Sequence, residues 1–202
     1  MPYTIHRYPA ELIDIVRGSA GERIVIRPVL PQDAEPMQDF VRGLSAESRR
    51  NRFFRTLHEL PASLLDRFTS IDYHDHLALL ASVLVDGEEV VIGEARYVVS
   101  EPGTAEFAVA VADGWQGRGI GRFLLARLEC RAAAEGIARF FGEVLPSNRP
   151  MHRLARQLGF MVVPGGNGDG LWRVEKRLDA RKSSRPCVES TAFESAFVAH
   201  AQ

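Results

Sequence analysis

A glycine-rich segment between an expected strand and an expected helix is the part of the chain best suited to chemistry. It reads Gln116-Gly117-Arg118-Gly119-Ile120-Gly121 and is followed by Arg122. Glycines let the backbone adopt left-handed angles and let a ligand approach closely, while the free N–H groups of a first helical turn attract an anion. The segment therefore predicts a loop that binds phosphate or pyrophosphate, with Arg118 and Arg122 adding positive charge.

Two common phosphate-binding loops fit this segment poorly. A Walker loop ends in Gly-Lys-Ser/Thr, and that triplet is absent. A dinucleotide fingerprint needs a third glycine at the position of Arg122, and it follows the first strand of a parallel sheet. A nicotinamide-binding domain is thus a weak rival, and a glycine-rich connection without a ligand is the structural alternative.

Hydrophobic periodicity and turn residues predict the elements that would hold this loop. Helices are expected at 31–42, 45–54, 61–68, 120–135 and 149–158, and strands at 22–27, 77–85, 89–99, 104–111, 139–145, 160–163 and 171–178. Asp86-Gly87 predicts a hairpin turn between two of the strands. Several adjacent strands followed by a strand–helix–strand–helix–strand unit predict an α+β fold, with a mixed, mostly antiparallel central sheet flanked by helices.

Composition limits the class of protein. With 202 residues, 46% of them hydrophobic and 25% charged, the chain fits one globular domain. The net charge of −1 argues against a nucleic-acid binder, and the longest apolar run, residues 77–85, is far shorter than the ~20 residues that span a membrane. The N-terminus lacks signal-peptide architecture and the two cysteines, Cys130 and Cys187, are expected to be free thiols, so a cytoplasmic location is expected.

A change of composition after Leu178 sets the expected domain boundaries. Residues 1–21 are expected to be an N-terminal extension, 22–178 the compact domain, and 179–202 a charged, Ser-rich tail. Within the tail, Thr191 and Glu194 can form a capping box ahead of a short docked helix; a disordered end is the alternative.

The loop, together with Asn148 and Gly159-Phe160, resembles the acyl-CoA pyrophosphate motif of the GNAT superfamily of N-acetyltransferases, Gln/Arg-x-x-Gly-x-Gly/Ala. The resemblance covers roughly residues 22–178 and includes Ile26-Arg27-Pro28 with Asp33. Within the superfamily, the stretches 44–54, 72–81 and 105–108 are most similar to the acetyltransferase domain of bacterial protein-lysine acetyltransferases.

The resemblance implies acetyl-CoA as co-substrate and no metal. It implies that the pantetheine arm lies along the fourth core strand, that the pyrophosphate lies on the loop, and that the asparagine contacts the pantetheine or the adenosine arm. The cofactor-binding residues implied are Val109, Ala110, Val111, Gln116, Gly117, Arg118, Gly119, Ile120, Gly121, Arg122 and Asn148. The partners expected are acetyl-CoA and an amine acceptor, with no nucleic acid and no membrane; a homodimer stays open.

Glu106 is the expected catalytic base. A lysine amine has a pKa of ~10.4, so a proton must leave before the amine can attack. Strand alternation places Glu106 on one face with small residues, which would leave room for ligands, and the position resembles the base of family protein acetyltransferases. A solvated carboxylate on an edge strand, or one paired with Arg96 across the hairpin, is the alternative role, and Glu143 and Glu94 are the alternative bases.

One position departs from the family pattern. Many members carry a tyrosine seven residues after the asparagine, to protonate the departing thiolate, and Ala155 stands there. The function expected is transfer of an acetyl group from acetyl-CoA to an amine by direct attack in a ternary complex, with a protein lysine as the first acceptor. An acetyltransferase of small-molecule amines and a catalytically weak CoA-binding sensor are the alternatives.

Overall fold

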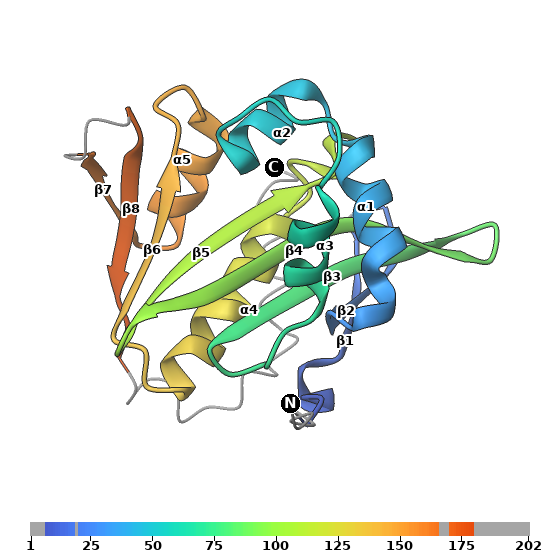
Figure 1. Cartoon of the computed structure of the whole chain (residues 1–202), viewed down its shortest axis with the longest axis horizontal. Coiled ribbons are helices and arrows are strands. Elements are labelled where there is room, and N and C mark those ends of the chain that lie inside the picture. Colours follow the sequence, from blue (N-terminus) through green and yellow to red (C-terminus); the bar gives the residue numbers. More distant parts are fainter. Residues whose placement is uncertain (1–6, 19, 166–169, 180–202) are drawn as a thin grey trace.

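The computed structural model describes residues 7–18, 20–165 and 170–179. The sheet has eight strands in the order β1-β2-β3-β4-β5-β6-β8-β7, and it is antiparallel throughout except for the parallel pair β5 and β6 (Figure 1). The strands are β1 (Asp14–Arg17), β2 (Arg23–Pro28), β3 (His76–Val85), β4 (Glu88–Glu101), β5 (Thr104–Val111), β6 (Arg139–Val144), β7 (Met161–Pro164) and β8 (Trp172–Arg177). The predicted mixed α+β fold is confirmed.

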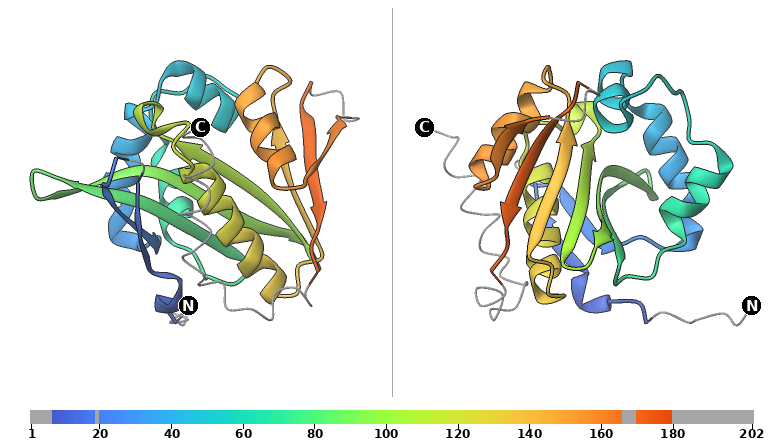
Figure 2. Two further views of the ribbon diagram at one scale, coloured as in Figure 1. Left: turned by 180° about the vertical axis from the view of Figure 1, so that it is seen from behind. Right: turned by 60° about the vertical axis from the view of Figure 1, so that its left-hand side comes forward.

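In the described part of the chain, five α-helices cover the two faces of the sheet. They are α1 (Ala34–Gly43), α2 (Ala46–Phe53), α3 (Ala62–Thr69), α4 (Ile120–Ala134) and α5 (Arg149–Gln157). Helices α1 to α3 lie over one face, where Met37, Phe40 and Phe68 pack with Leu80. Helix α4 crosses the opposite face, seen from behind in Figure 2, and contributes Leu124 and other apolar residues to the larger core. Short 3-10 turns, η1 (Ala10–Leu12), η2 (Pro31–Asp33) and η3 (Asp113–Trp115), complete the described elements.

Strands β5 and β6 separate after a short stretch of pairing. Thr104, Ala105 and Glu106 pair with Arg139, Phe140 and Phe141, and beyond them the two strands splay apart (Figure 1). Gly142 lies at the point of separation, where an added Cβ would come 3.0 Å from the ring and the carbonyl oxygen of Phe107. A glycine therefore lets β6 approach β5 closely before it diverges, without pressing on Phe107.

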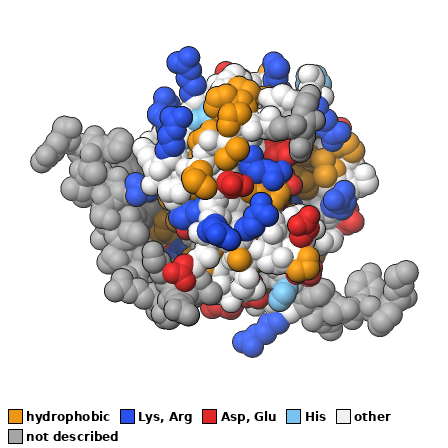
Figure 3. Space-filling model, turned by 90° about the vertical axis from the view of Figure 1, so that its left-hand side faces the viewer, with side chains coloured by type: hydrophobic (Ala, Val, Ile, Leu, Met, Phe, Trp, Pro, Cys, Tyr) orange, Lys and Arg blue, Asp and Glu red, His pale blue; other side chains and the backbone are white. Residues whose placement is uncertain are grey.

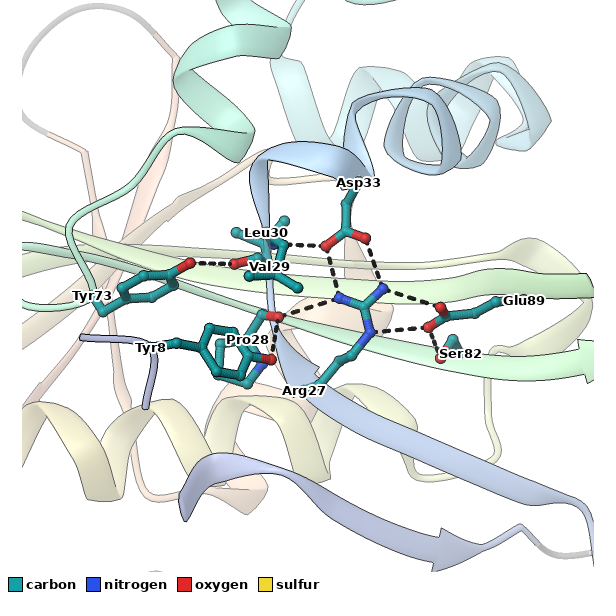
Figure 4. A network of polar contacts seen from close by, with 9 residues as sticks. All are labelled: Tyr8, Arg27, Pro28, Val29, Leu30, Asp33, Tyr73, Ser82 and Glu89. Atoms are coloured by element: carbon teal, nitrogen blue, oxygen red, sulfur yellow. Dashed lines mark hydrogen bonds and ion pairs between the residues drawn. The ribbon is translucent and has the colours of Figure 1, made fainter. Parts of the chain in front are cut away.

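The early Arg27-Pro28 and Asp33 signature forms a polar network that joins β2, η2 and β4 (Figure 4). The Arg27 guanidinium donates to both oxygens of Asp33, each at 2.7 Å, and to both oxygens of Glu89, at 3.0 and 3.2 Å. Asp33 also accepts from the Leu30 N–H, and Glu89 from the Ser82 hydroxyl. These bonds fix the turn from the second strand into α1, so the signature is structural.

The expected helices and strands are present within a few residues of their predicted ends, with one addition. Strand β1 pairs with β2 along Asp14–Arg17, ahead of residue 22; its Val16 is buried, as is Leu12 in the turn before it. The prediction of free thiols is wrong for Cys130, which is disulfide-bonded. Cys187 and the predicted tail helix lie outside the described residues.

No helix in the described part of the chain is long and apolar enough to cross a membrane.

Removal of the Asp33 carboxylate should destabilise the fold. The Asp33 side chain is 5% exposed, and Asp33→Ala leaves the partly buried Arg27 guanidinium and the Leu30 N–H without an acceptor. We expect the free energy of unfolding in urea to fall by about 3 kcal/mol. The control is Glu89→Ala, which removes the more exposed partner of the same arginine and should cost less than about 1 kcal/mol. Equal losses in the two variants would show that Asp33 does not hold the turn.

Candidate active site

A cleft of about 540 Å³ opens where β5 and β6 separate. Its walls come from α2, β5, the loop before α4, the first turn of α4, the end of β6 and α5. Every residue that the sequence predicted as catalytic or cofactor-binding lines this one cleft: Glu106, Val109, Ala110, Val111, Gln116, Gly117, Arg118, Gly119, Ile120, Gly121, Arg122 and Asn148. The structure thus brings together two groups that lie more than 25 residues apart in the chain, the loop and Asn148.

The glycine loop presents a helix N-terminus to the cleft. Gly117 and Gly119 have φ angles of +73° and +82°, a region that side chains disfavour, and Gly119 directly precedes α4. Ile120 and Gly121, in the first turn of α4, line the cleft. The N–H groups of a first turn have no acceptor within their own helix, and the helix dipole adds partial positive charge there. The geometry is that of an anion site.

Three arginines line the same region, but they differ in how free their charge is. Arg118 pairs with Glu22 at 2.9 Å and lies 4.8 Å from the centre of the Trp115 ring. Arg122 and Arg153 line the cleft without an ion-pair partner among the described residues. Arg153 was missed by sequence reasoning; its signal was an arginine in the second turn of the helix that begins after Asn148.

Helix α2 is fastened to the glycine loop by a cluster of hydrogen bonds. The Asp113 carboxylate accepts from the Ser45 N–H, the Ser45 hydroxyl and the Ser48 hydroxyl, each at 2.8 Å. Although burial raises the pKa of Asp113, these bonds lower it below its usual value. The Gln116 side-chain amide donates to the Ser48 hydroxyl and to the Val111 carbonyl, both at 3.1 Å.

This cluster changes the interpretation of Gln116. In the structure its amide joins the loop to α2 and β5, so the residue positions the loop as well as lining the cleft. Sequence reasoning missed Asp113, Ser45 and Ser48. The available signals were the Ser45 N-cap, which accepts from the Ser48 N–H, and an acidic residue directly before the glycines.

Glu106 lies at the vertex where the strands separate. It is opposite Val98 on β4 and Phe141 on β6, and it is exposed to the cleft. Its carboxylate has no hydrogen-bond or ion-pair partner among the described residues. Partial burial and the Glu143 carboxylate raise the pKa of Glu106, and the opposing effect of Arg173 and Arg52 is smaller. A free carboxylate with a raised pKa suits a general base.

Of the two alternatives to Glu106, Glu94 is engaged elsewhere and Glu143 shares the cleft. Glu94 is 1% exposed and pairs with Arg96 and with Arg52, so it has no access to a substrate. The pairing of Glu106 with Arg96 that would have made Glu106 structural is absent, because Arg96 bonds to Glu94. Glu143 lines the cleft and lies 3.9 Å from Arg173.

No tyrosine of the described chain lines the cleft. Ala155 is fully buried in the core, and Asn148 caps α5 by accepting from the Met151 N–H at 3.1 Å. The hydroxyls of Tyr73 and Tyr97 donate to the carbonyls of Val29 and His74. A departing thiolate would therefore take its proton from solvent or remain ionised, which a thiol pKa near ~8.5 allows.

Within the described residues, no group of three or more His, Cys, Asp or Glu side chains is placed to hold a metal ion.

Comparisons with known proteins agree with this geometry. Residues 44–160 match the model of the acetyltransferase (GNAT) family. The chain is 34% identical over 142 residues to acetyltransferase PA5475 of Pseudomonas aeruginosa, covering 70% of this chain and 76% of that protein. It is 34% identical over 150 residues to acetyltransferase Pat of Mycolicibacterium smegmatis, covering 73% of this chain but only 44% of Pat. The structure of the GNAT domain of S. lividans PAT superposes with a TM-score of 0.77 at 32% identity, covering 85% of this chain and all of that domain.

A charged side chain on the glycine loop should abolish its anion site. Gly119→Glu places bulk and negative charge at the N-terminus of α4, and we expect the affinity for CoA, measured by calorimetry, to fall at least about tenfold, or ~1.4 kcal/mol. The control is Gly136→Glu at the other end of α4, where φ is +81° and the backbone strain is the same. Unchanged affinity in a folded Gly119→Glu variant would show that the pyrophosphate binds elsewhere.

Proposed function

The chain belongs to the acetyltransferase (GNAT) family, and on that premise we propose that it moves the acetyl group of acetyl-CoA to the side-chain amine of a protein lysine. Membership of the family makes it an acetyl-CoA-dependent N-acetyltransferase. The lysine acceptor, the direct attack and the residue roles are the proposal. The observation that carries them is one cleft with an anion-binding helix terminus at one end and the unpaired Glu106 carboxylate at the vertex of the split sheet.

The cofactor would lie across the split in the sheet. Its pyrophosphate would accept from the N–H groups of the loop and the first turn of α4, with Arg122 and Arg153 near its phosphates. Its pantetheine arm would run along Val109–Val111, where the edge of β5 that faces β6 has lost its strand partner. Asn148 would use its amide N–H₂ group toward the arm, since its side-chain oxygen already caps α5.

Glu106 would accept a proton from the acceptor ammonium, directly or through one water. The neutral amine then attacks the thioester carbonyl, so that the N–C bond forms and the C–S bond breaks. The second proton of the attacking nitrogen passes to the departing thiolate or to solvent, and CoA leaves. A backbone N–H on the unpaired edge of β5 would stabilise the negative charge that develops on the thioester oxygen. Both substrates must be bound together, because the amine attacks the thioester itself.

A protein lysine is supported by the likeness to Pat and by the charge of the cleft. The carboxylates of Glu47, Glu106 and Glu143 line the cleft together with the arginines near the glycine loop, and these carboxylates favour an ammonium group on a long side chain. A small-molecule amine is the rival acceptor, and a catalytically weak CoA sensor is the alternative that the lack of a tyrosine suggests.

Turnover separates these three functions. The protein is incubated with acetyl-CoA and either a panel of small amines or a protein lysate, with free thiol release and mass spectrometry as readouts. Acetylated lysines in proteins, formed faster than in enzyme-free controls, support the proposal. Turnover with small amines alone would show the rival acceptor, and CoA binding without turnover would show a sensor.

Replacement of the base should lower the rate without loss of cofactor binding. We expect Glu106→Gln to lower kcat about 100-fold at neutral pH, because a positioned base contributes roughly 10²–10⁴-fold. The rate of the variant should recover partly toward pH 10, where the amine is already neutral. Because the pKa of Glu106 is raised, wild-type kcat/KM should fall as pH drops through a value above the ordinary 4.5.

The matched control is Glu47→Gln, a carboxylate that lines the same cleft from α2, away from the split in the sheet. It should change kcat less than about threefold, and calorimetry should give wild-type CoA affinity for both variants. A Glu106→Gln variant with near-wild-type kcat at pH 7, and with chemistry rate-limiting, would exclude Glu106 as the base and make Glu143 the next residue to test.

A further inference from the structure

The sheet face that carries Glu106 is only half covered by helices. Helices α1 to α3 pack over the strands on one side, and the side chains of β6, β8 and β7 on that same face remain partly open. Strand register places Phe141 opposite Glu106 and then Glu175, and it places Glu143 opposite Arg173. Figure 3 shows the side of the molecule that bears these strands, where side chains of both charges lie among apolar ones.

The guanidinium of Arg173 on β8 stacks on an aromatic ring, and its N–H groups make no hydrogen bond among the described residues. Its guanidinium carbon lies 4.3 Å from the centre of the Phe141 ring, within the range of a cation–π contact. The nearest carboxylate, Glu143, is 3.9 Å from Nη2, which is too far for a hydrogen bond. The side chain is 35% exposed and has no hydrogen bond among the described residues. The aromatic ring thus orients a planar, bidentate donor that has no hydrogen-bond acceptor among the described residues.

The other arginine beside the base is already engaged. Arg52 on α2 donates to Glu94 at 3.3 Å, and its guanidinium lies about equally far, 5.0 and 5.3 Å, from the rings of Phe53 and Phe68. Its side chain is only 10% exposed. Arg52 is therefore part of the cleft wall, whereas the more exposed Arg173 is accessible to a carboxylate of a bound substrate.

Arg173 is also close to the reacting end of the cleft. Its guanidinium stacks on Phe141, which pairs directly with Glu106 across the strands. Glu143, two residues further along β6, pairs with Arg173 across the strands and lines the cleft. The charge of Arg173 reaches Glu106, since it lowers the pKa of that carboxylate against the effect of Glu143. A peptide whose lysine amine reaches Glu106 would bring residues one to three positions away past this guanidinium, at ~3.3 Å per residue.

We propose that Arg173 is a specificity-determining residue that binds an aspartate or glutamate side chain close to the acceptor lysine. This inference rests on the proposed function, because it requires a peptide acceptor. The carboxylate of the substrate would supply the bidentate acceptor that Glu143 is too distant to be. Preferred acceptors would then be lysines with an acidic residue within three positions, and a positive neighbour would be repelled.

Synthetic peptides test this preference. Each carries one lysine in a glycine–serine background, with Asp, Gln or Arg placed one, two or three residues to either side. We expect wild-type kcat/KM for the best Asp peptide to exceed that for its Gln counterpart by about threefold to tenfold. Arg173→Gln should reduce this ratio to about one, and Arg173→Glu should favour the Arg peptide.

The ratio isolates recognition from other effects of the substitution. A change in the pKa of Glu106 or a small shift in packing alters the rate for every peptide alike and cancels in the ratio. The matched control is Arg177→Gln on the same strand and face, an exposed arginine four residues away, or ~13 Å, with no ion pair among the described residues. It should keep the wild-type ratio, and CoA affinity should be unchanged in all variants.

The two proposals fail in different ways. Equal kcat/KM for Asp and Gln peptides in the wild type, or an Asp preference that survives Arg173→Gln, would overturn the role of Arg173 and leave lysine acetylation standing. No turnover with any lysine peptide, with small amines acetylated or not, would overturn both proposals.

Discussion

The separation of β5 from β6 after Glu106 is the constraint on which the site depends. Only Thr104 to Glu106 are paired with β6, so the following residues of β5 offer an unpaired backbone edge next to an open cleft. Gly142 lies at the point of separation, where a side chain would press on Phe107. One feature of backbone pairing thus provides the cleft, the edge along it and the position of the carboxylate at its vertex.

A set of hydrogen bonds joins two walls of the cleft, the segment before the glycine loop and the start of α2. Asp113, beside the glycine loop, is bonded to Ser45 and Ser48 at the start of α2. These bonds tie the glycine loop to α2, and both elements line the cleft. The buried Glu94 fastens α2 further, through Arg52. None of these ion pairs and hydrogen bonds involves Glu106, whose carboxylate has no partner among the described residues.

The charged groups around Glu106 influence its pKa. Partial burial and Glu143 raise its pKa, and Arg173 and Arg52 oppose the shift. The two arginines differ in accessibility. Arg52 is mostly buried and pairs with Glu94, whereas Arg173 stacks on Phe141 and makes no hydrogen bond among the described residues. An enzyme of this family that acts on protein lysines needs some contact beyond the lysine itself to choose among them, and the guanidinium of Arg173 is placed to make one.

The sequence alone was sufficient for the elements with local signals. The left-handed glycines, the Asp86-Gly87 turn and the strand alternation around Glu106 depend on neighbours within a few residues, and each of these features is present as expected. Contacts between distant segments were decided by the tertiary structure. Strand β1 carries a weak four-residue pattern and exists by pairing with β2. Strand β8 lies between β6 and β7, which places Arg173 beside Glu143, and packing joins Arg96 to Glu94 and Asp113 to Ser45. No local pattern encodes these partners, because many arginines and carboxylates in the chain could pair, and burial and strand order decide which of them meet.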